Sequence, residues 1–155
     1  MKRFRFTLQA LLIVLEQREQ AALMAYARAL ADRRKALERW LDAQRLCEEA
    51  FRLGRERAAA GATAAHLAQL QEYCRSVKEF EELRLEEVRR ADRVVESALA
   101  RFLSARQSRE GVQRVQQAQR ERYDRASRRE EQKLLDDLAQ HMGLAVERLS
   151  AEFGG

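Results

Sequence analysis

Residues 67–105 read LAQLQEYCRSVKEFEELRLEEVRRADRVVESALARFLSA, and this stretch decides the fold class. Apolar residues recur in it at alternating steps of three and four, which is the spacing of the a and d positions of a coiled coil. We expect one helix over about residues 64–141, and a helix of this length needs a partner helix to cover its apolar side. The predicted a/d residues of this helix are Leu67, Leu70, Cys74, Val77, Val88, Ala91, Val95, Ala98, Phe102, Ala105, Val112, Tyr123 and Ala126.

The first half of the chain carries a second helical pattern, over about residues 7–57. Between the two patterns, residues 58–65 read AAAGATAA, where Gly61 can adopt a left-handed conformation and Thr63 can cap the next helix. We therefore expect the chain to reverse at residues 58–63. The fold class is all-α, a long antiparallel two-helix coiled-coil hairpin. The predicted a/d residues of the first helix are Leu23, Tyr26, Leu30, Leu37, Trp40, Cys47 and Phe51, with Arg33 and Gln44 as polar members.

Folding the chain at Gly61 predicts a register in which the numbers of facing residues add up to about 121. This register places Cys47 against Cys74 and apolar residues against apolar residues over most of the hairpin. It also places Trp40 against Glu81, which is a mismatch. Either the hairpin is locally rotated there, or Phe80 and Leu83, which lie beside the seam, are exposed. We expect Trp40, Tyr73 and Phe80 to form a partly exposed apolar patch.

The second helix is longer than the first, so residues from about 115 to 140 have little of the first helix to pack on. We expect the helix to stop near Gly143 and residues 142–155 to form a tail, all within a single domain of residues 1–155. Lys2, Arg3 and Arg5 lie at the same end of the hairpin. The unpaired part of the second helix is rich in basic residues, namely Arg114, Arg120, Arg122, Arg125, Arg128, Arg129 and Lys133.

The composition argues against an enzyme. The chain has 155 residues, 35% of them charged and 6% aromatic, which is typical of a coiled coil rather than of a compact domain with a pocket. His66 and His141 are isolated from other metal-ligand residue types, so we expect no metal site and no cofactor. Two cysteines form no disulfide framework, which favours a reducing cytoplasm. The net charge of +5 indicates an acidic partner or a solvated surface.

Three motifs resemble the FliJ family of flagellar export coiled coils. They are FRFTLQALL at residues 4–12, GATAAHL followed by LQEYCRSV at residues 61–77, and RREEQKLLDDLAQ at residues 128–140. The motifs occur in order, around one turn, and cover the chain up to about His141. The resemblance implies a non-enzymatic stalk of the flagellar type III protein export apparatus, a protein of motility and chemotaxis. It also implies a cytoplasmic location, peripheral to the inner membrane.

The resemblance further implies the partners and the residues that contact them. The paired termini would enter the ring of the export ATPase hexamer, the middle of the hairpin would contact the cytoplasmic ring of the export gate, and empty substrate chaperones would be escorted. The expected ATPase-ring residues are Phe4, Phe6, Leu8, Leu11, Leu12, Arg120, Tyr123, Arg125, Arg128, Arg129 and Lys133. The expected gate residues are Trp40, Ala43, Cys47, Tyr73, Val77, Phe80 and Arg84, and Ala43 and Cys47 stand where relatives have aromatic residues.

Three other functions fit a basic coiled coil. A virulence-secretion stalk of the YscO type would share the architecture, although the opening motif of residues 4–12 favours the flagellar branch. A nucleic-acid-binding protein would use the arginines, but they lack interleaved aromatic residues and any known reading motif, so no specific nucleic acid is expected. A passive structural coiled coil would have no effect on an ATPase.

Overall fold

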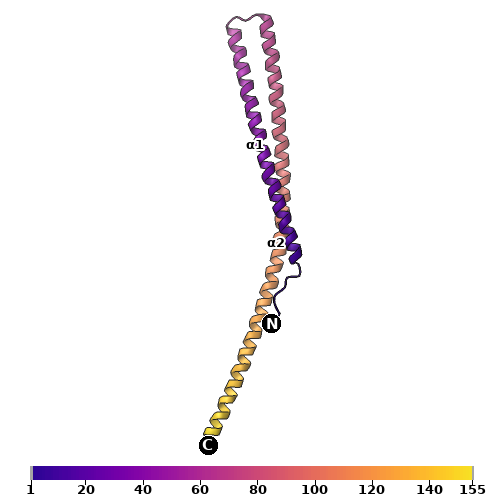
Figure 1. Ribbon diagram of the computed structural model, residues 1–155. Helices are drawn as coiled ribbons and strands as arrows, with labels where there is room; N and C mark the ends of the chain where they lie inside the picture. The colour runs from indigo at the N-terminus through magenta and orange to yellow at the C-terminus, as the bar shows by residue number, and fades with distance from the viewer. Residues whose placement is uncertain (1, 155) are drawn as a thin grey trace. The chain divides into compact units, whose positions relative to one another are not determined.

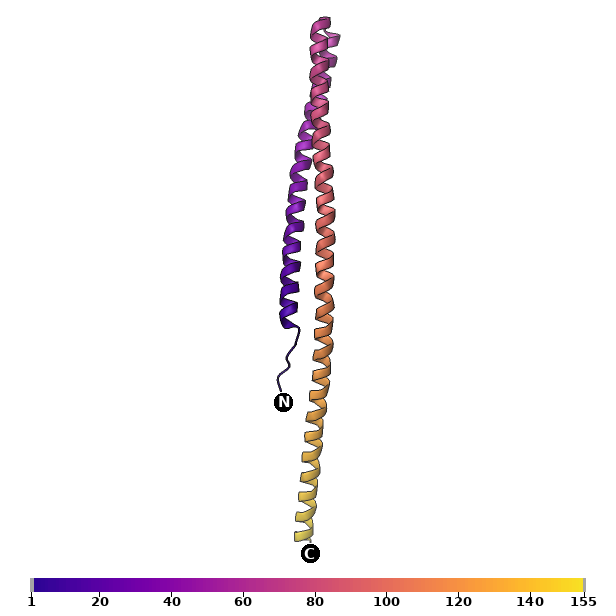
Figure 2. The ribbon, with the colours of Figure 1, turned by 90° about the vertical axis from the view of Figure 1, so that its right-hand side faces the viewer.

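The computed structural model describes residues 2–154 and consists of two long helices joined by a short turn (Figure 1). Helix α1 spans Gln9–Ala59 and helix α2 spans Ala64–Phe153. Over residues 15–107 the two helices lie side by side and run in opposite directions, as the perpendicular view also shows (Figure 2). The prediction of an all-α antiparallel hairpin is confirmed.

The turn forms as its sequence predicts. Gly61 has a φ of 83°, the left-handed region in which a side chain would be strained. The amide of Ala62 donates to the carbonyl of Arg57 (3.1 Å), which closes the end of α1. The hydroxyl oxygen of Thr63 accepts from the amide of His66 (3.3 Å), so Thr63 is the N-cap of α2.

The predicted end of the second helix is wrong. We expected it near residue 141, with a tail after Gly143, but α2 continues through Gly143 to Phe153. A glycine inside a helix costs only about 1 kcal/mol relative to alanine. The residues from Leu144 to Phe153 include no proline and favour a helix, so they outweigh that cost. The other boundaries lie within two residues of the predicted ones.

The chain divides into two compact units, which we describe separately. Unit 1 comprises residues 1–14 and 108–155, and unit 2 comprises residues 15–107. In unit 1, Leu12 is the buried apolar side chain among the described residues, with 3% of its surface exposed. In unit 2, Cys47, Ala50 and Val77 form a buried cluster against which Cys74 packs. The single-domain interpretation stays a prediction.

The α1 surface that faces α2 in unit 2 differs in part from the predicted one. Leu23, Leu30 and Phe51 are about 40% exposed, at 39%, 38% and 44%. Cys47, a predicted member of the seam, is buried. The other buried residues of α1 in unit 2 each lie one position before a predicted member, in four successive heptads, and are Ala29, Ala36, Ala43 and Ala50. We call these four residues the alanine stripe.

The alanine stripe was missed because the larger leucines next to it carry more apolar surface and dominate a hydrophobic pattern. The facing helix supplies the volume instead, since Val77 and Val88 of α2 are buried. Small residues on one helix opposite larger ones on the other let the two backbones approach and fill the space between them. The predicted α2 residues lie half-buried or buried from Leu67 to Tyr123, which confirms that part of the pattern, whereas Ala126 is exposed.

The observed register agrees with the predicted one only in part. The residue numbers of contacting pairs add up to 121 for Trp40 and Glu81, and to 124 for Ala50 and Cys74. They add up to 125 for Arg33 and Asp92 and to 128 for Tyr26 and Phe102, so the predicted value of about 121 lies at the edge of the observed range. At Tyr26 the pairing is shifted from the predicted one by seven residues, about two helical turns. The prediction that Cys47 and Cys74 occupy neighbouring layers is confirmed, because both belong to the same cluster.

Candidate partner-binding surfaces

In unit 1, an extended N-terminal segment (residues 2–8) is attached to α2 by side chains on one face of that helix. The hydroxyl of Tyr123 donates to the carbonyl oxygen of Lys2 (2.5 Å), and the ring of Tyr123 lies 5.5 Å from the ring of Phe4. The guanidinium of Arg120 lies 5.5 Å above the Phe4 ring, a cation–π contact. The start of α1 is attached as well, since the amide of Gln116 donates to the side-chain oxygen of Gln9 (3.1 Å).

These contacts bring together three of the residues expected to bind the ATPase ring, Phe4, Arg120 and Tyr123. Among the other expected residues of this group, Leu12 is buried and Phe6 is half-buried. Arg125 donates to the carbonyl oxygen of Glu121 (3.4 Å) and lies 4.0 Å from its carboxylate. The remaining expected residues are exposed, namely Leu8, Leu11, Arg128, Arg129 and Lys133.

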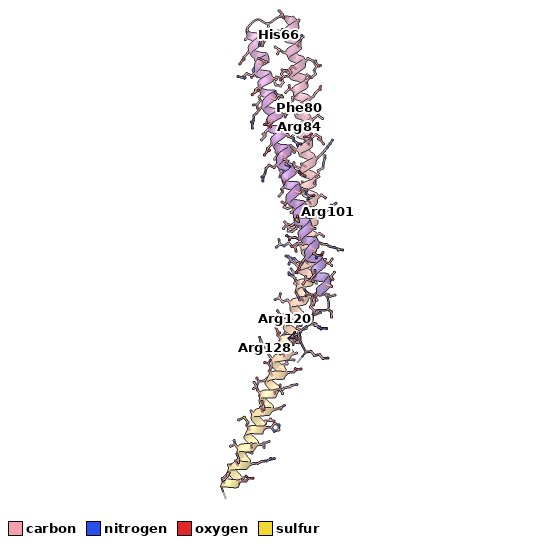
Figure 3. The ribbon with its side chains drawn as sticks, in the orientation of Figure 1. His66, Phe80, Arg84, Arg101, Arg120 and Arg128 are labelled. Carbon is pink, nitrogen blue, oxygen red and sulfur yellow. The ribbon has the colours of Figure 1, made fainter. Side chains whose placement is uncertain are left out.

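Residues 114–133 and the N-terminal segment together form the basic surface, as we name it here. Residues 114–133 contain seven lysines and arginines against four carboxylates, and the N-terminal segment adds Lys2, Arg3 and Arg5. The side chains of Arg120 and Arg128 extend from the helix in Figure 3. Since the N-terminal segment is attached to α2 at Tyr123, its positive charges lie beside those of the helix, and the arrangement suits an acidic protein surface.

The residues expected to contact an export gate fall into two groups. Ala43, Cys47 and Val77 are buried between α1 and α2, where they hold the helices together. Tyr73 and Phe80 are exposed and lie seven residues apart, hence on the same face of α2. We call these two residues the aromatic patch.

The aromatic patch is extended by a charged side chain. The guanidinium of Arg84 lies 4.8 Å from the centre of the Phe80 ring. Figure 3 labels the two residues next to each other along α2. Arg84 also forms an ion pair with Glu87 at 3.0 Å. This pairing holds the guanidinium over the ring, so the patch presents an aromatic and a cationic group together.

Trp40 and Glu81, which the predicted register shows as a mismatch, form a hydrogen-bonded pair between α1 and α2. The indole N–H of Trp40 donates to one carboxylate oxygen of Glu81 (3.0 Å), and the ammonium of Lys78 donates to the other (3.2 Å). Glu81 is 8% exposed and is the buried charged residue among the described residues. Trp40 is half-buried, and its indole N–H has a partner inside the hairpin.

The hydrogen bonds to Glu81 determine its ionisation. The bond from Trp40, together with that from Lys78, lowers the pKa of the Glu81 carboxyl below its ordinary value, although burial acts the other way. The same contact raises the pKa of Lys78, because the carboxylate stabilises the ammonium. In the sequence, Glu81 occupies an a/d position between Val77 and Val88, and a charged residue at such a position indicates a buried polar pair. Polar groups at such positions fix register at a cost in stability.

The two thiols lie close to this pair. Both cysteines are free, and the Cys74 thiol contacts the carbonyl oxygen of Ala50 at 3.5 Å. Burial raises the pKa of the Cys47 thiol, which keeps it protonated and weakly nucleophilic.

A groove of about 680 Å³ runs along the hairpin near the turn. It is lined by apolar side chains, chiefly Phe51, Leu67 and Leu70, with Gly54 at its floor and charged residues such as Lys78 along its rim. The described residues contain no group of three or more histidines, cysteines and carboxylates placed to hold a metal ion. The groove is an apolar surface bordered by charged side chains.

Within residues 2–154, neither helix has an apolar stretch of the length that spans a bilayer.

Comparison with known proteins identifies the family. The model of the FliJ family, described as Flagellar FliJ protein, matches residues 4–147, which is most of the chain and includes the turn, residues 114–133 and the N-terminal segment from Phe4 onward. No curated protein and no solved structure matches the chain with significance. The two antiparallel helices agree with the coiled coil that the motifs predict. The chain belongs to the FliJ family, and its role lies in flagellar protein export.

Proposed function

We propose that the protein is a non-enzymatic stalk of the export apparatus and that its basic surface binds within the ring of the export ATPase. The observation that carries this proposal is the attachment of the N-terminal segment to α2 by Phe4, Arg120 and Tyr123. It places ten positive charges, against four carboxylates, on the paired termini. A surface with concentrated positive charge suits a pore lined by carboxylates, and the family match supports an export role.

We further propose that the aromatic patch contacts the cytoplasmic ring of the export gate. Tyr73 and Phe80 are exposed apolar groups, and Arg84 adds a cation at their edge. Aromatic and arginine side chains are the types that dominate binding energy in protein interfaces. The buried residues Ala43, Cys47 and Val77 would act indirectly, by holding the patch in place.

The remaining parts of the proposal concern the cell. A stalk at the export apparatus would be cytoplasmic and would associate with the inner membrane only through its partners. Escort of empty substrate chaperones would use the same hairpin surface. A virulence-secretion system of the YscO type is not favoured by any contact in the structure.

The ATPase proposal is tested with a charge-reversal variant. Changing Arg128, Arg129 and Lys133 together to glutamate should reduce stimulation of ATP hydrolysis by the export ATPase by at least about tenfold, because several exposed charge pairs are lost. Rising salt should weaken the native interaction in the same direction, since screening acts within about 10 Å at 0.1 M salt.

A matched control carries the same change of charge elsewhere. Arg28, Arg34 and Lys35 are exposed on α1 in unit 2, and their replacement by glutamate should leave stimulation within about twofold of native, because surface changes away from an interface have small effects. Equal loss in both variants would show that only net charge matters. Unchanged stimulation in the first variant would rule out the basic surface as the binding site.

A further inference from the structure

The N-terminal segment lies on α2 with its aromatic and basic side chains separated. Phe4 and Phe6 are half-buried, whereas Arg3 and Arg5 are exposed. Side chains of an extended chain point alternately to opposite sides, so residues 4 and 6 share one side and residues 3 and 5 share the other. The segment therefore contacts the helix through its aromatic rings and keeps its cations in solvent.

The attachment of this segment brings positive charges onto a positive helix. The segment contributes Lys2, Arg3 and Arg5, and residues 114–133 carry seven lysines and arginines. With ten positive charges against four carboxylates, the basic surface has a net charge of +6. Like charges repel one another, and salt screens the repulsion. Electrostatic repulsion therefore opposes the attachment, and the contacts of Phe4 and Tyr123 act against this repulsion.

The attachment is also loosely packed. A hollow of about 400 Å³ lies beside the Phe4 ring and is lined by Gln113, Gln116, Gln117 and Arg120. Holding a non-helical segment in one conformation costs conformational entropy. Because the aromatic contacts are opposed by both this entropy and the charge repulsion, the attached and detached states of the segment lie close in free energy.

We propose that the N-terminal segment is a strap whose closure on α2 responds to negative charge on a partner. An acidic surface that contacts both the segment and α2 reduces the repulsion between them, so partner binding and strap closure favour each other. The closed strap adds its three cations to those of the helix, and the partner then meets the complete basic surface. This inference rests on the proposed function, because the acidic partner is the ring of the export ATPase.

The state of the strap is measured at Tyr123 in the full chain without a partner. The chain has three tyrosines, and the ring-labelled tyrosine NMR signal that Tyr123→Phe removes is that of Tyr123. The Phe4 ring current displaces this signal in the closed state, so the Phe4→Leu variant gives its open position. Raising NaCl from about 0.02 M to about 0.5 M should move the native signal further from that position, since screening weakens the repulsion. In Phe4→Leu the signal should not respond to salt.

Two further changes isolate the effect of charge. The variant K2Q/R3Q/R5Q removes the cations of the segment, so its Tyr123 signal should already lie at the high-salt position at about 0.02 M NaCl. The control R28Q/R34Q/K35Q makes the same change of charge on α1 in unit 2 and should give the native signal. Adding a poly-glutamate peptide to the native protein at low salt should also close the strap, whereas poly-lysine should not.

The coupling to the partner is measured as binding to the export ATPase hexamer. Phe4→Ala and Tyr123→Ala change no charge, yet each should weaken binding by at least about fivefold, because the cations of the segment leave the basic surface. The double variant should bind about as well as the weaker single variant, since both changes remove the same closed state. Phe153→Ala removes a ring that is 86% exposed in unit 1, and this control should bind as the native protein does.

The strap and the proposed function fail in different ways. A Tyr123 signal that does not respond to salt, to poly-glutamate or to K2Q/R3Q/R5Q overturns the strap. Native affinity of Phe4→Ala and Tyr123→Ala for the hexamer overturns its regulatory role, while loss of stimulation on charge reversal at residues 128–133 would still assign ATPase binding to the basic surface. If the native protein does not bind the hexamer at all, the proposed function is overturned together with the role of the strap.

Discussion

Glu81 is the residue whose environment departs most from its ordinary one. A carboxylate between two helices would be costly without partners, but the Trp40 indole and the Lys78 ammonium each occupy one of its oxygens. The Trp40 donor lies on α1, so a shift of α1 along α2 would leave the buried carboxylate of Glu81 without this hydrogen bond. We infer that this pair contributes to register, as polar residues do at the centre of other coiled coils.

Stability should depend on pH through this residue. The folded-state pKa of Glu81 is below its ordinary value of 4.5, so its carboxylate stabilises the fold above that pH and the contribution is lost as pH falls through the folded pKa. Glu81→Gln should cost about 1–3 kcal/mol of unfolding free energy near neutral pH. Urea titrations should show the difference from native narrowing below pH 4.5. A difference that stays constant across this range would contradict the assigned ionisation.

The two cysteines give a direct check of the register at the residue scale. Cys47 and Cys74 belong to one cluster, so mild oxidation of purified protein should produce a fast-migrating intramolecular disulfide on a non-reducing gel. Because burial raises the pKa of Cys47, the reaction should accelerate as pH increases. The Cys47→Ser variant should lack the band. Exclusive formation of intermolecular dimers would mean that the register is wrong.

At the scale of the element, the alanine stripe determines how closely α1 packs on α2. Ala29, Ala36, Ala43 and Ala50 recur every seven residues and are all buried. Regular spacing of the smallest apolar side chain lets the residues of α2 lie against the α1 backbone. The leucines beside the stripe remain partly exposed and are available to partners.

Enlarging one alanine should separate the helices. Ala36→Leu inserts three carbon atoms into a filled space and should cost about 1–3 kcal/mol of unfolding free energy, measured by thermal or urea denaturation. Ala31→Leu, on the exposed face of the same helix, is the control and should change stability by less than about 0.5 kcal/mol. Comparable stability of the two variants would show that Leu30 and its neighbours, rather than the alanines, face α2.

For the whole molecule, the separation into units predicts what a truncation removes. The contacts within unit 2, residues 15–107, do not involve residues after Arg114. A chain ending at Arg114 should therefore retain a helical hairpin by circular dichroism, with a melting transition close to native. It should also lose stimulation of the export ATPase, because most of the basic surface is missing. Stimulation at the native level would assign ATPase activation to the hairpin itself.

The sequence by itself determined the fold class, the turn and the a/d residues of α2. These depend on local chemistry: the heptad spacing of apolar residues, the absence of proline, the left-handed glycine at Gly61 and the cap at Thr63. The three motifs also indicate the FliJ family, to which the chain belongs.

Only the tertiary structure decided which side of α1 faces its partner. A hydrophobic pattern favours leucine over alanine because leucine has more apolar surface. Packing between two helices depends instead on side-chain volume, and alanines fit the space that α2 leaves. Glu81 is a second example, because the sequence alone shows only a charged residue mismatched with Trp40. In the structure, its carboxylate accepts hydrogen bonds from Trp40 and Lys78. The Trp40 partner of this buried group lies on the other helix, and the spacing of residues along α2 does not contain it.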